Sequence, residues 1–179
     1  GKIMATLDGS QPNTFVSVGL GQIRSIKVNI VGEAVAPGTY TLSSLATLFN
    51  ALYAAGGVND IGSLRNIKVY RNSKEIASLD VYDYLLNGKY ETNIRLEDND
   101  MIIIGPYEQL VTAGGKVKRD RTYELRRGET LADLLDMAGG FTGDAYTGSI
   151  RVKRKAGDRY KIATVNEEQF QTFVLQDGD

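Results

Sequence analysis

Ala54-Ala55-Gly56-Gly57 returns further along the chain as Met137-Ala138-Gly139-Gly140, 83 residues later. At that offset and without a gap, ten of the 26 positions from Gly32 to Gly57 are identical to positions 115–140. A repeat of this length is a small domain and exceeds a solenoid unit. The sequence therefore predicts two tandem copies of one domain, at 23–106 and 107–179. Residues 1–22 are expected to form an arm or the tail of a preceding domain.

Each glycine pair is expected to end a helix. The first helix is predicted from apolar residues at i, i+3, i+4 and i+7 (Leu45, Leu48, Phe49, Leu52), with Ser43 or Ser44 as its N-cap. In the second copy, Thr130 is the expected N-cap with Asp133 three residues on, and Leu131, Leu134, Leu135 and Ala138 form the stripe. A helix C-terminus favours a residue with positive φ, which glycine adopts readily, whereas phosphates bind at helix N-termini. We therefore interpret Gly56, Gly57, Gly139 and Gly140 as structural helix caps.

The remaining pattern predicts an α+β domain. The first copy reads as strands at 26–30 and 39–42, the helix, strands at 67–71 and 76–79, a short helix from Asp80 to Gly88, and a buried strand at 101–104. That order is typical of a β-grasp domain. The second copy follows the same plan until 175–179, which match 96–100 at an offset of 79. We expect the loss of four residues near its second helix.

The second copy has no counterpart of residues 101–104 within this sequence. Its sheet should therefore contain an open slot, and unpaired strand edges recruit other strands. We expect a neighbouring chain or the arm at 13–19 to fill the slot. Otherwise it stays open, with residues near 170–179 poorly ordered.

Composition excludes several classes of function. The net charge of −1 creates no global field directed at nucleic acid, and no apolar run approaches the 18 residues of a membrane span. Without Cys or His there is no Cys/His zinc site, catalytic thiolate or imidazole base. The pairs Asp98/Asp100 and Asp177/Asp179 occupy the same turn of both copies, so the repeat explains them better than glycosidase chemistry does. We expect no catalytic residue, cofactor or metal.

From about residue 23 to 179 the sequence resembles the soluble-ligand-binding β-grasp (SLBB) repeats of bacterial polysaccharide export proteins. The matching pieces are 31–33 with 37–40, 51–57, 62–67, 69–71, 80–83 and 96–102. Asn99 stands where the family usually has glycine, and Asp120-Arg121 replaces Pro37-Gly38 in the second copy. Nothing here matches the family's lipid-attachment cysteine, N-terminal export domain or C-terminal membrane helix.

The resemblance implies a non-catalytic periplasmic module of an exporter at the outer membrane. The resemblance implies three partners. They are copies of the same protein in a ring, a polysaccharide that can be acidic, and an inner-membrane biosynthesis or export protein. A rival hypothesis is a stand-alone small-ligand-binding β-grasp protein. That function needs an enclosed pocket with converging polar groups, and no motif here demands one.

Basic residues are the candidate binding site for glycan or a partner. Arg151, Lys153 and Lys155 alternate along a predicted strand and so share one face. The other candidates are Lys118, Arg119, Arg121, Arg71 and Tyr70. The competing interpretation is a solvated face whose charge is offset by Asp144, Asp158 and Glu124. Tyr82, Tyr84 and Tyr90 are weaker candidates for stacking on sugar rings, while Tyr40 and Tyr123 are expected in the two cores.

Overall fold

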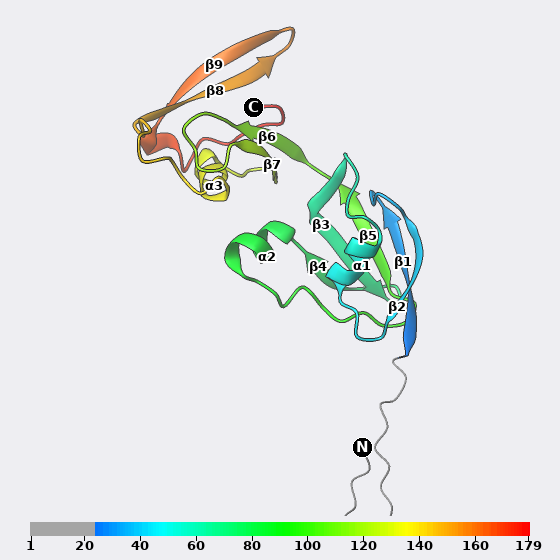
Figure 1. The fold of residues 1–179 in the computed structure, drawn as a ribbon. Helices are drawn as coiled ribbons and strands as arrows, with labels where there is room; N and C mark the ends of the chain where they lie inside the picture. The colour runs from blue at the N-terminus through cyan, green and yellow to red at the C-terminus, as the bar shows by residue number, and fades with distance from the viewer. Residues whose placement is uncertain (1–23) are drawn as a thin grey trace, which may run out of the picture.

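The computed structural model describes residues 24–179 of the 179-residue chain. Its elements form two α+β units, each with its own apolar core (Figure 1). The first core contains buried residues between Ile26 and Ile104, and the second between Val111 and Leu175. The predicted tandem β-grasp fold is confirmed. The predicted arm at 1–22, with the segment 13–19 that could fill the slot, lies outside the described residues.

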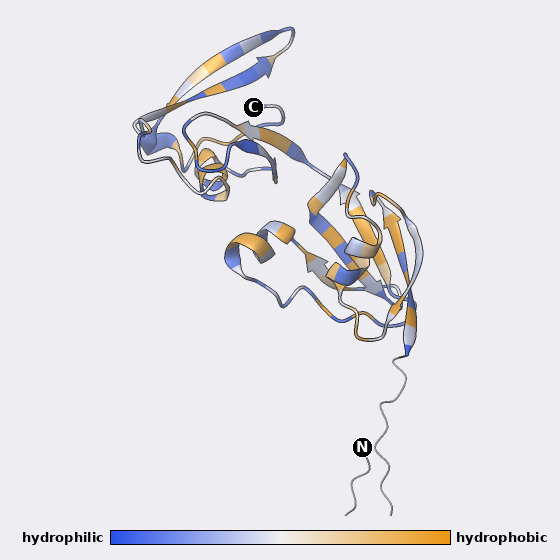
Figure 2. Cartoon of the chain, in the orientation of Figure 1, coloured by the Kyte–Doolittle hydropathy of each residue, from blue (hydrophilic) through white to orange (hydrophobic). Residues whose placement is uncertain are grey.

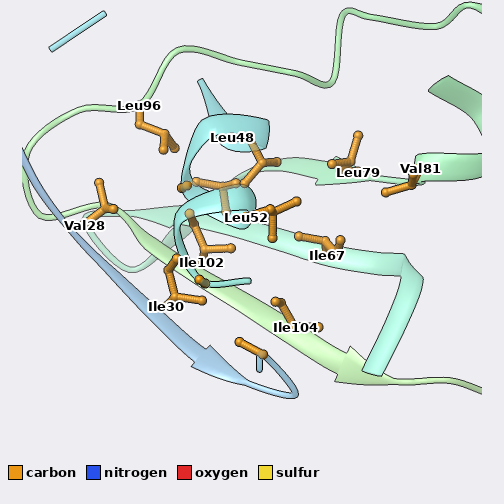
Figure 3. Packing of buried hydrophobic residues seen from close by; sticks show 14 of the residues in the cluster. Val28, Ile30, Leu48, Leu52, Ile67, Leu79, Val81, Leu96, Ile102 and Ile104 are labelled. Atoms are coloured by element: carbon orange, nitrogen blue, oxygen red, sulfur yellow. The ribbon is translucent and has the colours of Figure 1, made fainter. Parts of the chain in front are cut away.

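The first unit is built on a mixed sheet in the order β2-β1-β5-β3-β4. Its strands are β1 (Ser25–Gly32), β2 (Gly38–Ser43), β3 (Gly62–Arg71), β4 (Lys74–Leu79) and β5 (Met101–Pro106). β5 lies in the middle, parallel to β1 and antiparallel to β3. Helix α1 (Leu48–Ala54) covers one face, where Leu48 and Leu52 meet Ile30, Ile67 and Ile102 (Figure 3). The short helix α2 (Val81–Asn87) follows β4.

The second unit has the same plan but no joined sheet. β6 (Gln109–Ala113) pairs with β7 (Arg121–Leu125), and β8 (Ser149–Ala156) pairs with β9 (Arg159–Asn166), as two separate two-stranded sheets. Helix α3 (Leu131–Met137) packs against this core, and a 3₁₀ turn η1 (Glu167–Gln169) takes the place of α2. The β8–β9 hairpin extends away from the rest of the unit (Figure 1).

The two units share one backbone down to the pairing of individual residues. Val28 pairs with Tyr40 in the first hairpin, and Val111 pairs with Tyr123 at the same repeat positions. The isolated bridges Ala34–Val58 and Val117–Phe141 also correspond at the offset of 83. Because register is set by the buried face and a slip by one residue would reverse that face, this agreement shows that the sequence repeat is a structural repeat.

The glycine pairs end their helices as predicted. Gly56, Gly57, Gly139 and Gly140 have φ between 77° and 85°. The amides of Gly57 and Gly140 donate to the carbonyl oxygens of Leu52 and Leu135, five residues back in each helix. The carbonyl oxygens of the same two glycines accept hydrogen bonds from the loop of the preceding hairpin. The pairs therefore stop the helix and tie it to that hairpin.

Three local predictions need correction. Helix α1 begins after Thr47, not after Ser43 or Ser44, and Leu45 lies outside it with 56% of its surface exposed. Thr47 and Asn50 form a capping box, as Thr130 and Asp133 do in the second unit, because the chain needs residues 43–46 to turn from β2 onto the sheet face. The second unit's second helix is a single 3₁₀ turn.

The four-residue difference between the copies is the sum of two changes. Ile67 pairs with Leu79, 12 positions on, whereas Ile150 pairs with Val165, 15 positions on, so the β8–β9 hairpin is longer by three residues. From Leu79 to the bridge residue Arg95 is 16 positions, but from Val165 to Val174 is only nine, so seven are lost at the second helix. The net offset concealed the longer hairpin.

Candidate functional site

The β8–β9 hairpin presents a row of cations on one face. Arg151, Lys153 and Lys155 are exposed and alternate with Val152 and Arg154, which turn inward. Same-face residues of a strand repeat every ~6.5–7 Å, so the three charges form an evenly spaced line. Their cross-strand partners are Thr164, Ile162 and Tyr160. Figure 2 shows the hydrophilic character of β8 along this hairpin.

An aromatic ring and an aliphatic side chain accompany the cations. Tyr160 and Ile162 are 60% and 67% exposed, and the Lys153 Nζ lies 4.2 Å from the centre of the Tyr160 ring. Such a contact holds the ring in place while the rest of its surface faces water. The face therefore combines positive charge with exposed aromatic and aliphatic surface.

The acids proposed to neutralise this face are engaged elsewhere or do not pair with it. Within residues 24–179, no salt bridge involves Arg151, Lys153 or Lys155. Asp144 pairs with Lys116 at 2.6 Å, and both Glu124 carboxylate oxygens accept hydrogen bonds from the first unit. Asp158, in the turn between β8 and β9, takes part in no salt bridge within residues 24–179, so none of the three acids forms an ion pair with the row.

The loop that joins β6 to β7 contains Lys118 and Arg119, and Arg121 follows it at the start of β7. These residues do not belong to the cation row of β8. The Arg119 guanidinium donates to the Met137 carbonyl oxygen at 2.8 and 3.2 Å, where it satisfies the C-terminus of α3. Lys118 and Arg121 are exposed. Of the basic residues on this loop, Lys116 is the one that lines the same groove as Arg151 and Lys153.

Arg71 and Tyr70 belong to the first unit and serve its internal structure. Arg71 binds both carboxylate oxygens of the buried Asp100 at 2.8 Å, and this hydrogen bonding raises its pKa. The Tyr70 hydroxyl contacts the Glu75 carboxylate at 3.2 Å. The eight predicted residues thus lie in three places: strand β8, the β6–β7 loop with the start of β7, and the end of β3. Of these eight, Arg151, Lys153 and Lys155 form a row on one strand face without a salt bridge within residues 24–179.

A groove of about 640 Å³ runs between β6 and β8. Its floor is apolar and its rim on the β8 side is basic. The floor residues include Val111, Ala113, Leu131, Leu134, Val152 and Leu175. Residues 174–179 border the groove, where Arg154 holds the Asp179 carboxylate and the Thr112 amide donates to the Asp179 carbonyl.

Comparison with known proteins places this geometry in a family. Two family models described as SLBB domain match residues 26–104 and 110–163. The chain belongs to the SLBB domain family. Two curated relatives are both the polysialic acid transport protein KpsD of Escherichia coli, each 30% identical over 173 residues. The alignment covers 94% of this chain and 30% of each relative, so the chain spans about a third of the length of those proteins.

The two SLBB domains meet through a polar network that the sequence analysis missed. Arg65 of β3 donates from Nη1 and Nη2 to the two carboxylate oxygens of Glu129, at 2.6 and 2.8 Å, and from Nε to Asp80 at 3.0 Å. Burial lowers the pKa of Arg65, but the hydrogen bonds to Glu129 and Asp80 raise it by more, so its charge is secure. A fully charged, bidentate arginine therefore joins the domains.

Glu124 of the second SLBB domain completes this network. It is 6% exposed and accepts from the Ser63 hydroxyl at 2.5 Å and from the Leu64 amide at 2.8 Å. Its own amide donates to the Tyr82 hydroxyl, and burial raises the pKa of that tyrosine. In β7, Tyr123, Glu124 and Leu125 are all buried, so the strand alternation is interrupted at Glu124. In sequence, Glu124 stands between Tyr123 and Leu125 as an outward-facing strand residue would, so the strand pattern contained no signal of its burial.

No membrane-spanning helix occurs in the described part of the SLBB pair, residues 24–179. The same residues contain no cluster of three or more acidic, His or Cys side chains arranged to hold a metal ion.

Proposed function

We propose that this tandem SLBB pair is a non-catalytic periplasmic module of a polysaccharide export protein at the outer membrane. The observation that carries the proposal is the alignment of both domains, across 94% of the chain, with a protein named for polysialic acid transport. Polysialic acid is a polymer of sugars that each carry a carboxylate. The unpaired cation row of β8 has the complementary charge.

Within that role, Arg151, Lys153 and Lys155 form the proposed contact with an acidic polysaccharide. Each exposed ion pair in water contributes only about 0–1 kcal/mol, so the polymer would be held weakly and at several points. Weak, repeated contacts suit a surface past which a polymer must move. Screening by salt, with a Debye length of about 8 Å at physiological ionic strength, would weaken them further.

The proposal includes assembly into a ring of identical subunits and contact with an inner-membrane biosynthesis or export protein. The division into domains at 23–106 and 107–179 is part of it, with residues 1–22 as an arm or the tail of a preceding domain. The hydrogen-bond network at Arg65 and Glu124 supports it, because a ring needs its two domains in a constant orientation. Electron microscopy of the full-length exporter tests the assembly: closed symmetric rings are expected, and dispersed single subunits would contradict it.

The glycan contact is tested by titrating ¹⁵N-labelled protein with a sialic acid oligomer, with neutral dextran as the comparison ligand. We expect chemical-shift changes at the amides of β8 and β9 that diminish as salt is added. The triple variant Arg151→Gln, Lys153→Gln, Lys155→Gln should lose these changes. A charge-matched control is Arg24→Gln, Lys27→Gln, Lys74→Gln, which removes three exposed cations from the first domain. Equal loss in both variants would mean that only net charge matters, and would refute a specific site.

A further inference from the structure

Four aromatic rings of the first domain lie next to one another at its surface. The ring centres of Tyr53 and Phe49 in α1 are 6.4 Å apart, and the Tyr84 ring of α2 is 4.5 Å from that of Phe49. Tyr90, in the loop after α2, lies 6.1 Å from Tyr84, edge to face. We call these four residues the aromatic ridge. Of the three tyrosines predicted to stack on sugar rings, Tyr84 and Tyr90 belong to it, whereas Tyr82 lies at the domain contact.

The outer rings of the ridge are exposed and are not required by the fold. Tyr53 and Tyr90 are 80% and 69% exposed, while Phe49 packs against the core. At the offset of 83, the second domain has Ala132 and Asp136 in place of Phe49 and Tyr53, yet it forms the corresponding helix α3 with the same capping box. Exposed apolar side chains that gather in one patch mark an interaction site, whereas scattered ones do not.

Contacts outside the ridge hold its rings in place. The Asn93 Oδ1 accepts a hydrogen bond from the Phe49 amide at 3.1 Å, which ties the loop after α2 to the start of α1. Gly88 ends α2 with a φ of 66°, and a Cβ built there would lie 3.8 Å from the Tyr90 hydroxyl. The turn at Gly88 therefore brings Tyr90 back to Tyr84. A surface that is already ordered loses little conformational entropy when a ligand binds.

Carboxamide groups border the ridge. Residues three or four apart share a helix face, so Asn50 lies beside Tyr53 in α1, and Asn87 lies beside Tyr84 in α2. Asn50 and Asn93 accept hydrogen bonds through Oδ1, and within residues 24–179 their Nδ2 atoms donate to no protein group. A carboxamide can both donate and accept, so these groups suit a ligand that carries hydroxyls.

The ridge is separate from the exposed leucines of α2 and has no unpaired cation in residues 83–91. The two leucines at 85–86 follow Tyr82 by three and four positions, so they share its face, which is directed at the second domain. Asp83 pairs with Lys89 at 3.2 Å, and Glu91 is the other charged residue of this segment. Any attraction of the ridge for an acidic polymer therefore depends on its rings and carboxamides, not on positive charge.

We propose that the aromatic ridge is a second glycan-binding surface, on which pyranose rings of the exported polysaccharide stack. The faces of a pyranose ring carry C–H groups, which would cover the exposed aromatic rings, and its edge carries hydroxyls, which would meet the carboxamides. Covering apolar surface is favourable. An apolar protein surface would instead leave the carboxamides without partners, at a cost in free energy. The inference rests on the proposed export function, but it concerns the other domain and a different chemistry from the cation row.

The two surfaces should differ in what they recognise. Stacking depends on the sugar rings and not on their carboxylates, so binding at the ridge should persist in high salt and after the carboxylates are removed. Binding at the cation row is electrostatic and should be lost under either condition.

The test titrates the ¹⁵N-labelled protein with a sialic acid oligomer and with the same oligomer after reduction of its carboxylates to neutral alcohols. We expect both oligomers to shift the amides of residues 49–53 and 87–93, in low and in high salt. Sugar C–H protons that lie over an aromatic ring should move upfield. Only the charged oligomer should shift the amides of β8 and β9.

Substitutions of single exposed tyrosines show whether the ring itself binds. Tyr53→Ser should weaken binding at the ridge by about fivefold, the loss of roughly 1 kcal/mol of apolar burial. Tyr53→Phe should retain the binding, because stacking needs the ring and not the hydroxyl. Tyr146→Ser is the matched control, since Tyr146 of the second domain is exposed to the same extent, 78%.

Four results would overturn the proposal. They are no shift of the ridge amides with either oligomer, a shift with the charged oligomer alone, equal weakening by Tyr53→Ser and Tyr146→Ser, and a shift on raising the protein concentration alone, which would assign the ridge to a second copy. The outcome is separable from that of the hairpin titration. Shifts at β8 and β9 without shifts at the ridge would refute this inference and leave the proposed function intact, and the reverse result would refute the cation row and leave the ridge.

Discussion

Replacing Arg65 with methionine should loosen the two SLBB domains from each other and lower the stability of the protein substantially. The Arg65 side chain is only 8% exposed, and it binds Glu129 through two hydrogen bonds and Asp80 through a third. Methionine retains much of the apolar volume but leaves both carboxylates without this cation. Asp80 is itself 7% exposed, so its charge would remain in a site with little access to water.

The expected loss follows from this burial. Removing one partner of a buried ion pair costs about 3–5 kcal/mol of unfolding free energy. Arg126 also contacts Asp80, at 3.0 Å, and can compensate in part, so the lower end of about 3 kcal/mol is expected. For a chain of this size, 1 kcal/mol corresponds to about 2–4 °C in melting temperature, which gives a shift of about 6–12 °C.

The assay is thermal and urea unfolding of the variant beside a matched control, Lys116→Met. Lys116 also pairs with a carboxylate at 2.6 Å, but both side chains are about two-thirds exposed, so its loss should change the stability of the protein little. Hydrogen exchange at the Leu64 and Glu124 amides, which lie on opposite sides of the contact, would show whether the domains separate. If Arg65→Met is no more destabilising than Lys116→Met, the network does not hold the domains together, and the reasoning is wrong.

The other predictions concern a pH effect, an ion pair and a glycine. Burial raises the pKa of Tyr82 above 10.0, so the stability that its neutral hydroxyl contributes is complete below pH 10 and is lost as the pH rises through the higher pKa of the folded state. Unfolding at alkaline pH should therefore begin at a higher pH in the variant Tyr82→Phe. An unchanged onset would contradict this. Asp100→Asn should lower the unfolding free energy of the first domain in urea by about 2–3 kcal/mol. This loss is smaller than that for a fully buried ion pair, because Arg71 is a quarter exposed. A loss below about 0.5 kcal/mol would disprove the role of the pair. Gly32→Ala should lower the melting temperature far more than Gly115→Ala, because a Cβ at Gly32 would collide with the Ile104 carbonyl oxygen of β5. Gly115→Ala introduces only the strain of a positive φ, roughly 1 kcal/mol. Similar shifts in the two variants would show that the contact with β5 is unimportant.

The features predicted well from sequence are those that the repeat encodes twice. Gly57 and Gly140 were identified as helix ends because both copies place them after an apolar stripe, and the structure gives both the same backbone hydrogen bonds. Tyr123 was expected in its core because Tyr40 stands at the same repeat position, and it is 6% exposed. Asn99 was expected to replace glycine in a turn, and its φ of 66° confirms this.

Local patterns predicted less well where another part of the chain decides the outcome. Ser43 and Ser44 are good N-cap residues, but the helix must start where α1 reaches the sheet face, and Thr47 occupies that point. Arg65 is a cation of β3 whose burial the local sequence pattern does not indicate. It is buried because the second domain covers it, and the alternation of a single strand contains no information about a neighbour 60 residues away.

The distribution of charge links the domain contact to the exposed hairpin. Glu124 and Glu129 of the second domain are directed at the first, Asp144 is paired with Lys116, and Asp179 is paired with Arg154. These acids are therefore not available to the cations of β8. The hairpin is also three residues longer than its counterpart, which carries Lys155 and Tyr160 further from the acidic contact. Since a charge is screened within about one Debye length, ~8 Å in physiological salt, the acids of the domain contact have little effect on the hairpin, although the net charge of the chain is −1. A total charge near zero is thus compatible with binding an acidic polymer, because the position of each charge, and not the sum, decides what the hairpin attracts.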